Sequence, residues 1–287
     1  MRFTPFLFLL PGVVSWGLLG HQTVALIAQF YLLPKTVTER NEPGGGFTFG
    51  YHFVNGQDRP PPDSCKIEYP KDCPPEGCIV SAIANYTERL MDKKLERESR
   101  AEALRFLIHF VGDITQPRNF SLPPTVLSPM SQQLRKKVHT EAFGAGANSI
   151  LVYFAGKPTN LHAAWDTSIP NKIINTTSPT TLESLGWANA IASLINVGPY
   201  KRRLGSWVHD LDTEGNGPEN SAAKWAVDSN ELVCEYAIDV APEEINGTEI
   251  AGEYYDGAVP IVIEQIAKGG VRLAGWLNLI FEGKTGF

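Results

Sequence analysis

Two copies of the spacing His-x-x-x-Asp constrain this chain more than any other feature. The pairs are His109 with Asp113 and His162 with Asp166. Residues i and i+4 share one face of an α-helix, so each pair places an imidazole nitrogen beside a carboxylate oxygen. Ligands of this kind suit a zinc ion. The chain has only 6 histidines, so the repeated spacing favours a metal site over two unrelated surface pairs.

The first residues predict a secretory signal peptide over residues 1–15. Arg2 precedes a mostly apolar stretch, and the small Ser15 follows it at the expected cleavage position. This stretch is too short to span a membrane, and no other run is long and apolar enough to do so. Cleavage after Ser15 makes Trp16 the first residue of the mature chain. Its free α-amine and its carbonyl oxygen can then both ligate zinc.

Cysteines and glycosylation acceptors agree with an exported protein. The cysteines are Cys65, Cys73, Cys78 and Cys234, and four cysteines allow three pairings. The short turn from Cys73 to Cys78 can close locally, which leaves Cys65 with Cys234; zinc binding by these thiols is the alternative. Asn-x-Ser/Thr sequences predict glycosylation at Asn85, Asn119, Asn175 and Asn246.

The charge of the chain limits the kinds of partner that it can bind. The formal net charge is −6, and the basic residues form no stripe. A simple nucleic-acid-binding module needs a positive face to neutralise phosphates, so this class is disfavoured. A cluster of metal ions can nevertheless create a local cationic pocket for a phosphate in an acidic protein.

The hydrophobic periodicity is mostly that of α-helices. We expect helices over residues 22–33, 79–91, 99–114, 160–167, 182–197, 221–234 and 260–281. Alternation typical of a strand is sparse, and residues 149–154 are the best short candidate. The sequence therefore predicts an all-α protein with long loops, in which residues 16–287 form one domain.

Several segments together resemble one family of enzymes. They are Trp16 to His21, His52-Phe53, Arg105 to Pro117, Asn160 to Asp166, Ile266 to Ala274 and the four cysteines. These segments resemble the secreted, zinc-dependent, single-strand-specific nucleases of fungi and plants. The resemblance extends over nearly the whole mature chain, and it implies the multi-helix fold that these nucleases share with bacterial zinc phospholipase C.

The resemblance also implies a site with three zinc ions. The first would be held by the amine and carbonyl of Trp16 and by His21. Asp113 would bridge this ion to a second, which His52 and His109 also bind. His139, His162 and Asp166 would hold the third. His209 is left over and is interpreted as a surface residue.

The chemistry implied is hydrolysis of phosphodiester bonds in single-stranded DNA and RNA. A zinc-bound water would be the nucleophile, with Asp113 as the bridging ligand, and the products would carry 5′-phosphates. The resemblance also implies 3′-nucleotidase activity and a monomer that is secreted and not membrane-bound. Phe53 would stack on a base, Asn55 would meet the polar edge of that base, and Asn148 would contact the phosphate.

The sequence departs from the family pattern in two places. The family has a Trp-Ala-Asp motif before the second histidine, and its aspartate binds the zinc assigned here to His52 and His109. This chain has Thr38 to Gly46 in that region and no aspartate before Asp58; Glu42 is an alternative carboxylate, although its spacing does not favour it. An atypical insertion at about residues 118–138 also separates Pro117 from His139.

These departures leave alternatives open. One is a zinc phospholipase C-like phosphodiesterase on the same scaffold. Another is a family member that binds zinc but has impaired catalysis, because one aspartate ligand is missing. A skipped exon before His52 and a retained intron after Pro117 would explain both departures, and a transcript that spans the two junctions tests this hypothesis.

Overall fold

The computed structural model describes residues 16–34, 50–54, 65–117, 147–240 and 242–287. Its longer helices are α1 (Leu18–Tyr31), α2 (Ile79–Met91), α3 (Arg97–Asp113), α7 (Thr181–Asn196), α9 (Gly217–Leu232) and α11 (Glu253–Glu282). Its shorter helices are α5 (Leu161–Ala163), η3 (Ala164–Ser168), α6 (Ile169–Ile173), η4 (Pro199–Arg203), α8 (Leu204–Val208), η5 (Val233–Ala237) and α10 (Pro242–Ile245). One hairpin of β1 (Leu151–Phe154) and β2 (Lys157–Asn160) completes the described part.

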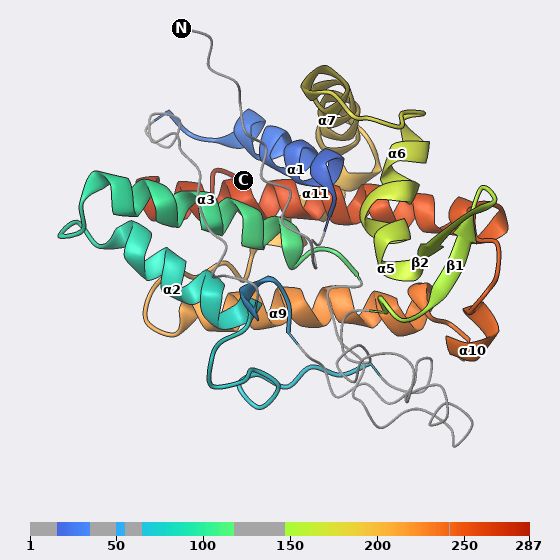
Figure 1. The fold of residues 1–287 in the computed structure, drawn as a ribbon. Helices are drawn as coiled ribbons and strands as arrows, with labels where there is room; N and C mark the ends of the chain where they lie inside the picture. The colour runs from blue at the N-terminus through green and yellow to red at the C-terminus, as the bar shows by residue number, and fades with distance from the viewer. Residues whose placement is uncertain (1–15, 35–49, 55–64, 118–146, 241) are drawn as a thin grey trace, which may run out of the picture.

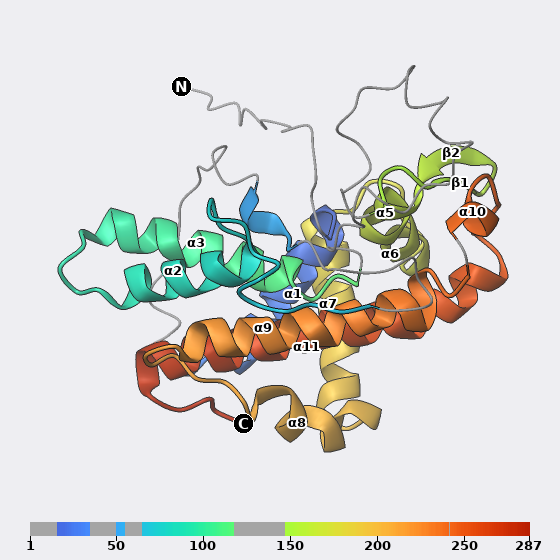
Figure 2. The same cartoon turned by 90° about the horizontal axis from the view of Figure 1, so that it is seen from below.

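The architecture confirms the predicted all-α fold. The long helix α11 runs through the fold, and α1 packs along it (Figures 1 and 2). Helix α2 packs against both α3 and α9. The antiparallel hairpin β1-β2 is the only sheet in the described part of the chain, with Leu151 opposite Asn160. No helix within the described ranges combines the length and apolarity that crossing a bilayer requires.

Some helix boundaries follow the sequence predictions closely, but α1, α9 and α11 begin four or more residues before their predicted starts. The structure places α2 on the predicted residues and shifts α3 and α7 by one or two positions. The last helix, however, begins at Glu253, so Pro260 lies inside it. A proline is common at a helix start because it lacks an N–H group, and this preference suggested the wrong boundary. Here the burial of the following residues outweighs the lost hydrogen bond.

Two adjacent glycines let α1 approach α11 closely. A Cβ atom at Gly270 would overlap the side chain of Ile27, and one at Gly269 would lie 2.9 Å from Oγ1 of Thr115. Both helices are buried on these faces. The small size of the pair, rather than its flexibility, therefore permits the contact and explains the Gly-Gly step in the Ile266 to Ala274 motif.

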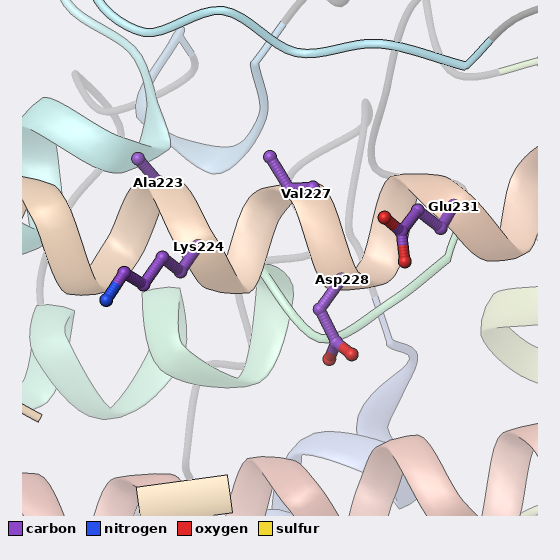
Figure 3. A pocket seen from close by; sticks show the side chains of 5 residues that line it. All are labelled: Ala223, Lys224, Val227, Asp228 and Glu231. Atoms are coloured by element: carbon purple, nitrogen blue, oxygen red, sulfur yellow. The ribbon is translucent and has the colours of Figure 1, made fainter. Parts of the chain in front are cut away.

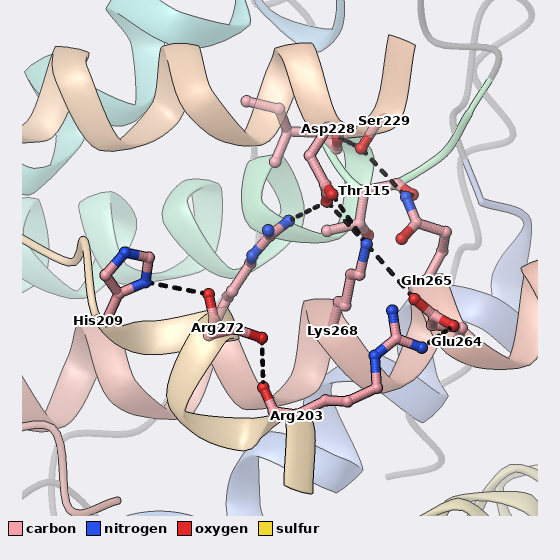
Figure 4. A network of polar contacts seen from close by, with 11 residues as sticks. Thr115, Arg203, His209, Asp228, Ser229, Glu264, Gln265, Lys268 and Arg272 are labelled. Carbon is pink, nitrogen blue, oxygen red and sulfur yellow. Dashed lines mark hydrogen bonds and ion pairs between the residues drawn. The ribbon is translucent and has the colours of Figure 1, made fainter. Parts of the chain in front are cut away.

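Buried polar side chains join α9 to α11 and to the end of α3 (Figure 4). Asp228 of α9 accepts hydrogen bonds from Lys268 and pairs with Arg272 at 3.0 Å. Gln265 Nε2 donates to the carbonyl of Thr115 at 3.1 Å and to Oγ of Ser229 at 3.2 Å. The residues that follow α3 are thus tied to both long C-terminal helices.

The disulfides have the pairing inferred from the sequence. Cys65 is bonded to Cys234 and Cys73 to Cys78. The first closes a loop with a sequence separation of 169 residues, which restricts the unfolded chain strongly. The second closes the turn before α2, and no free cysteine is found. The thiols are therefore not the metal ligands that the alternative required.

The glycine contact predicts the effect of a single methyl group. Gly270→Ala should lower the free energy of unfolding by about 1–3 kcal/mol, because the added Cβ forces Ile27 and α1 away from α11. Gly186→Ala is the matched control, since Gly186 lies in α7 with open space around it. That control should be neutral or slightly stabilising. Urea unfolding measures both, and equal effects would contradict the packing argument.

Candidate metal centre

Asp113 is the centre of the candidate site and ends helix α3. Its side chain has no exposure to solvent. His109 lies one turn earlier, and its Nε2 is 3.3 Å from Oδ2 of Asp113. A buried carboxylate at the C-terminal end of a helix faces the negative end of the helix dipole. It therefore needs positive charge or hydrogen-bond donors close by.

Two further histidines reach the same carboxylate from other parts of the chain. His21 of α1 places Nε2 at 3.1 Å from Oδ1, and His52 places Nδ1 at 2.7 Å from Oδ2. One oxygen therefore faces His21, and the other faces both His52 and His109. The rings of His21 and His109 are stacked with their centroids 4.0 Å apart. The two oxygens of Asp113 therefore face different imidazoles, and the bridging role that the family resemblance implies for Asp113 stays a prediction.

The donor set fits a metal ion. One ligand atom from each of His21, His109 and Asp113 lies within 4.8 Å of the other two. Nε2 of His21 is buried and makes no hydrogen bond of good geometry in the described part of the chain, although Oδ1 of Asp113 is near. This buried nitrogen faces a carboxylate oxygen without a hydrogen bond to it. A cation bound to both atoms would supply the missing interaction. Imidazole nitrogens with a carboxylate oxygen are zinc ligands.

The electrostatics keep the ligands in the required protonation states. Burial lowers the pKa of His109 to about 3, against the opposing effect of Asp113. Burial alone would raise the pKa of Asp113, but His109, His21 and His52 outweigh it and hold that pKa below its ordinary value. Neutral imidazole and ionised carboxylate are the forms that bind metals.

The second His-x-x-x-Asp pair is also formed. His162 lies in α5 and Asp166 in the π-helical turn η3, and Nε2 of His162 is 3.1 Å from Oδ2 of Asp166. Asn160 caps this helix by accepting from the N–H of Ala163 at 2.7 Å. Both members of the pair are buried. Burial raises the pKa of Asp166, and His162 and Gln116 oppose that rise.

Trp16 and Gln116 connect the second pair to the first. Gln116, three residues after Asp113, donates from Nε2 to Oδ1 of Asp166 at 2.6 Å. The indole N–H of the buried Trp16 donates to Oγ1 of Thr115 at 3.3 Å, and the next N–H, that of Gly17, donates to the carbonyl of Asp166 at 2.9 Å. Residue 16 is therefore tied by its indole to the segment that follows Asp113 and through its neighbour Gly17 to Asp166.

Glycines and a turn position the two histidines that lie far from α3 in the sequence. A Cβ at Gly112 would lie 2.8 Å from Nδ1 of His21, so only glycine leaves room for that ring. The carbonyl of Phe53 accepts from the N–H of Ile79 at 2.9 Å, which ties the segment of His52 to the start of α2. Sequence reasoning missed Gly112 and Gln116 as site residues, although both belong to the motif from Arg105 to Pro117.

The remaining predicted site residues have different outcomes. Phe53 and Asn148 are described and half-buried, whereas Asn55, His139 and the glycosylation acceptor Asn119 lie outside the described residues, as do Glu42 and the insertion at 118–138. The acceptors Asn85, Asn175 and Asn246 are all exposed. His209 is exposed and contacts Asp210 at 3.1 Å, in agreement with its interpretation as a surface residue.

A hollow on α9 is a different feature from this site. Its lining side chains all come from that one helix (Figure 3): Ala223, Lys224, Val227, Asp228 and Glu231. None of them is a predicted ligand, and Asp228 is already engaged with Lys268 and Arg272 of α11. The hollow therefore offers no metal ligands comparable to those around Asp113.

The fold and the cluster define an all-α protein with a candidate metal site at the end of α3. The chain belongs to the S1/P1 nuclease family, whose family model matches residues 39–282. It is 35% identical to Nuclease P1 of Penicillium citrinum, over 92% of this chain and 97% of the relative. It is 34% identical to Nuclease S1 of Aspergillus oryzae, over 93% and 92%, and 29% identical to Endonuclease 3 of Arabidopsis thaliana, over 96% and 92%.

Family membership confirms that the protein is an enzyme of the nuclease class, which hydrolyses phosphodiester bonds in nucleic acid. It also supports zinc as the metal of a zinc-dependent family, and the cluster of His21, His109 and Asp113 can bind a metal. The number of ions and the role of each ligand remain proposals.

The low pKa of His109 predicts how the metal-free protein responds to acid. An unfolded histidine has a pKa near 6.5, whereas folded His109 has a pKa of about 3. Between these values the unfolded state binds more protons, so the free energy of unfolding falls as the pH falls. His109→Asn should flatten this dependence between about pH 6.5 and pH 4. Thermal unfolding in chelator at several pH values measures it.

His209→Asn is the control for this experiment, because it removes an exposed histidine instead of the half-buried His109. It should keep the pH dependence of the unmodified protein. The same flattening in both variants would contradict the assignment of the effect to His109.

Proposed function

We propose that the protein is a secreted, zinc-dependent nuclease that cuts single-stranded DNA and RNA to products with 5′-phosphates, and that it also hydrolyses 3′-nucleotides. The observation that carries this proposal is the buried carboxylate of Asp113, which divides its two oxygens between His21 on one side and His52 and His109 on the other. The relatives named as nucleases support the substrate class.

The proposed ligand groups follow this division. His21 and the backbone of Trp16 hold one zinc, and His52 with His109 hold a second, with Asp113 shared between them. His162 and Asp166 hold a third together with His139. The contacts of Gln116 with Asp166 and of Gly17 with the Asp166 carbonyl support the idea that the groups act as one site. The aspartate missing before His52 makes the second group the weakest.

The protein residues prepare the chemistry in three ways. Zinc, when bound, supplies a Lewis acid and lowers the pKa of a ligated water to about 7. His109 stays neutral and keeps its nitrogen lone pair available. Gln116 fixes the orientation of Asp166. Phe53 stacks on an unpaired base and Asn148 contacts the phosphate; because a duplex hides the base faces, this stacking accounts for the preference for single strands.

Export and processing belong to the same proposal. Removal of residues 1–15 gives Trp16 a free amine at a position where the next N–H already bonds to Asp166. Secretion agrees with the two disulfides. The exposed Asn85, Asn175 and Asn246 are available for glycosylation. We further propose that the mature protein acts as a monomer.

Hydrolysis of heat-denatured DNA tests the proposed function. The zinc-loaded protein should degrade the denatured strand much faster than the duplex, and a chelator should abolish the activity until zinc is restored. His109→Asn should lower kcat/KM by about 100-fold or more, because it removes a direct ligand. His209→Asn should have little effect.

The other outcomes separate the alternatives. Cleavage that resists the chelator would contradict the metal mechanism. Zinc binding without turnover would favour an impaired family member, and hydrolysis of phosphatidylcholine in place of DNA would favour a phospholipase C-like enzyme.

A further inference from the structure

Arg105 is a cation that has no partner among the described residues and lies on α3, the helix of His109 and Asp113. It makes no ion pair, hydrogen bond or ring contact among the residues that the structure describes, and its Nε is buried. Glu102, three residues earlier on the same helix, pairs instead with Arg89 of α2 at 3.8 Å. A guanidinium that has lost part of its hydration without a partner is costly, and a bound anion would offset that cost.

The position of Arg105 relates it to the candidate site. Arg105 and His109 are four residues apart on α3 and share the half-buried face of this helix, with their Cβ atoms about 6 Å apart. The opposite face, which includes Leu104, Leu107 and Val111, is buried in the core. Side chains on a helix lean toward its N-terminus. The guanidinium of Arg105 therefore lies on the far side of His109 from Asp113.

This placement suits a neighbouring phosphate of the substrate better than the phosphate that is cleaved. The cleaved phosphate would lie at the His/Asp cluster around Asp113, whereas Arg105 lies farther along the same helix face. A single-stranded substrate carries a phosphate at every nucleotide, so its neighbouring phosphates extend beyond the centre. Arginine is well suited to such a contact, because its planar fork can donate two hydrogen bonds to one phosphate.

We propose that Arg105 binds a phosphate of the substrate strand next to the one that is cleaved. This inference rests on the proposed nuclease function and deepens it, because it assigns the enzyme a contact that a polynucleotide can make and a mononucleotide cannot. Arg105 thus favours strands over single nucleotides as substrates, and it supplies local positive charge in a chain with a net charge of −6.

The test compares Arg105→Gln with Arg97→Gln on two substrates. Arg97 lies exposed at the start of the same helix, so its variant matches the change in charge. Arg105→Gln should raise KM for the oligonucleotide (dT)10 about tenfold at low salt and leave the hydrolysis of a nucleoside 3′-monophosphate unchanged. The slope of log(kcat/KM) against log[salt] should become shallower by about 0.7, the value for one phosphate contact on a single strand. Arg97→Gln should change none of these.

A second variant guards against a loss of folding. Arg105→Lys keeps the charge but loses the fork, so it should keep the salt slope and raise KM for (dT)10 only a few-fold. If Arg105→Gln matches Arg97→Gln on (dT)10, or slows the mononucleotide reaction equally, the inference is wrong.

A binding measurement separates this inference from the proposed function. Fluorescence anisotropy of labelled (dT)10 in chelator reports strand binding without cleavage. Inactive wild-type protein that still binds (dT)10 through Arg105 would overturn only the nuclease proposal. Active enzyme whose binding does not depend on Arg105 would overturn only this inference.

Discussion

The carboxylate of Asp113 is the constraint on which the rest of the structure depends. It is a charge fully removed from solvent at the negative end of helix α3, a position that is unfavourable without compensation. Three imidazoles from separate parts of the chain surround it. Imidazole nitrogens that face carboxylate oxygens in this way are the donor set of a cation site, so the arrangement favours a cation between them. Metal binding and the stability of this end of α3 are therefore expected to be linked.

The three residues after Asp113 connect this centre to the rest of the fold. The carbonyl of Ile114 accepts from Ser229 of α9, and the carbonyl of Thr115 accepts from Gln265 of α11. Oγ1 of Thr115 accepts from the indole of Trp16, and Gln116 donates to Asp166. This short segment thus makes hydrogen bonds with α9, α11, Trp16 and the second His/Asp pair. Its buried hydrogen bonds hold the proposed ligand groups in a fixed relation, which catalysis by several ions requires.

The sequence predicts much of this arrangement, and the exceptions have physical causes. Local periodicity identified the long helices, and the i, i+4 rule identified His109 with Asp113 and His162 with Asp166. The meeting of His21 and His52 at Asp113 depends on contacts between distant segments, which no local pattern encodes; only the family resemblance indicated it. The sequence indicates Gln116 only as a member of the Arg105 to Pro117 motif. It does not predict the contact with Asp166, because Asp166 is 50 residues away in the sequence. The sequence does not predict the early start of α11, because Pro260 locally indicates the first turn of a helix.

We propose that Asp113 would be a ligand shared by two metal ions. The most direct test is the zinc content per chain of the purified mature protein, measured by mass spectrometry after gel filtration, with Asp113→Asn beside it. We expect the unmodified protein to retain more than one zinc, and the variant to lose zinc from both groups that share Asp113. Equal zinc content in the two proteins would contradict the account.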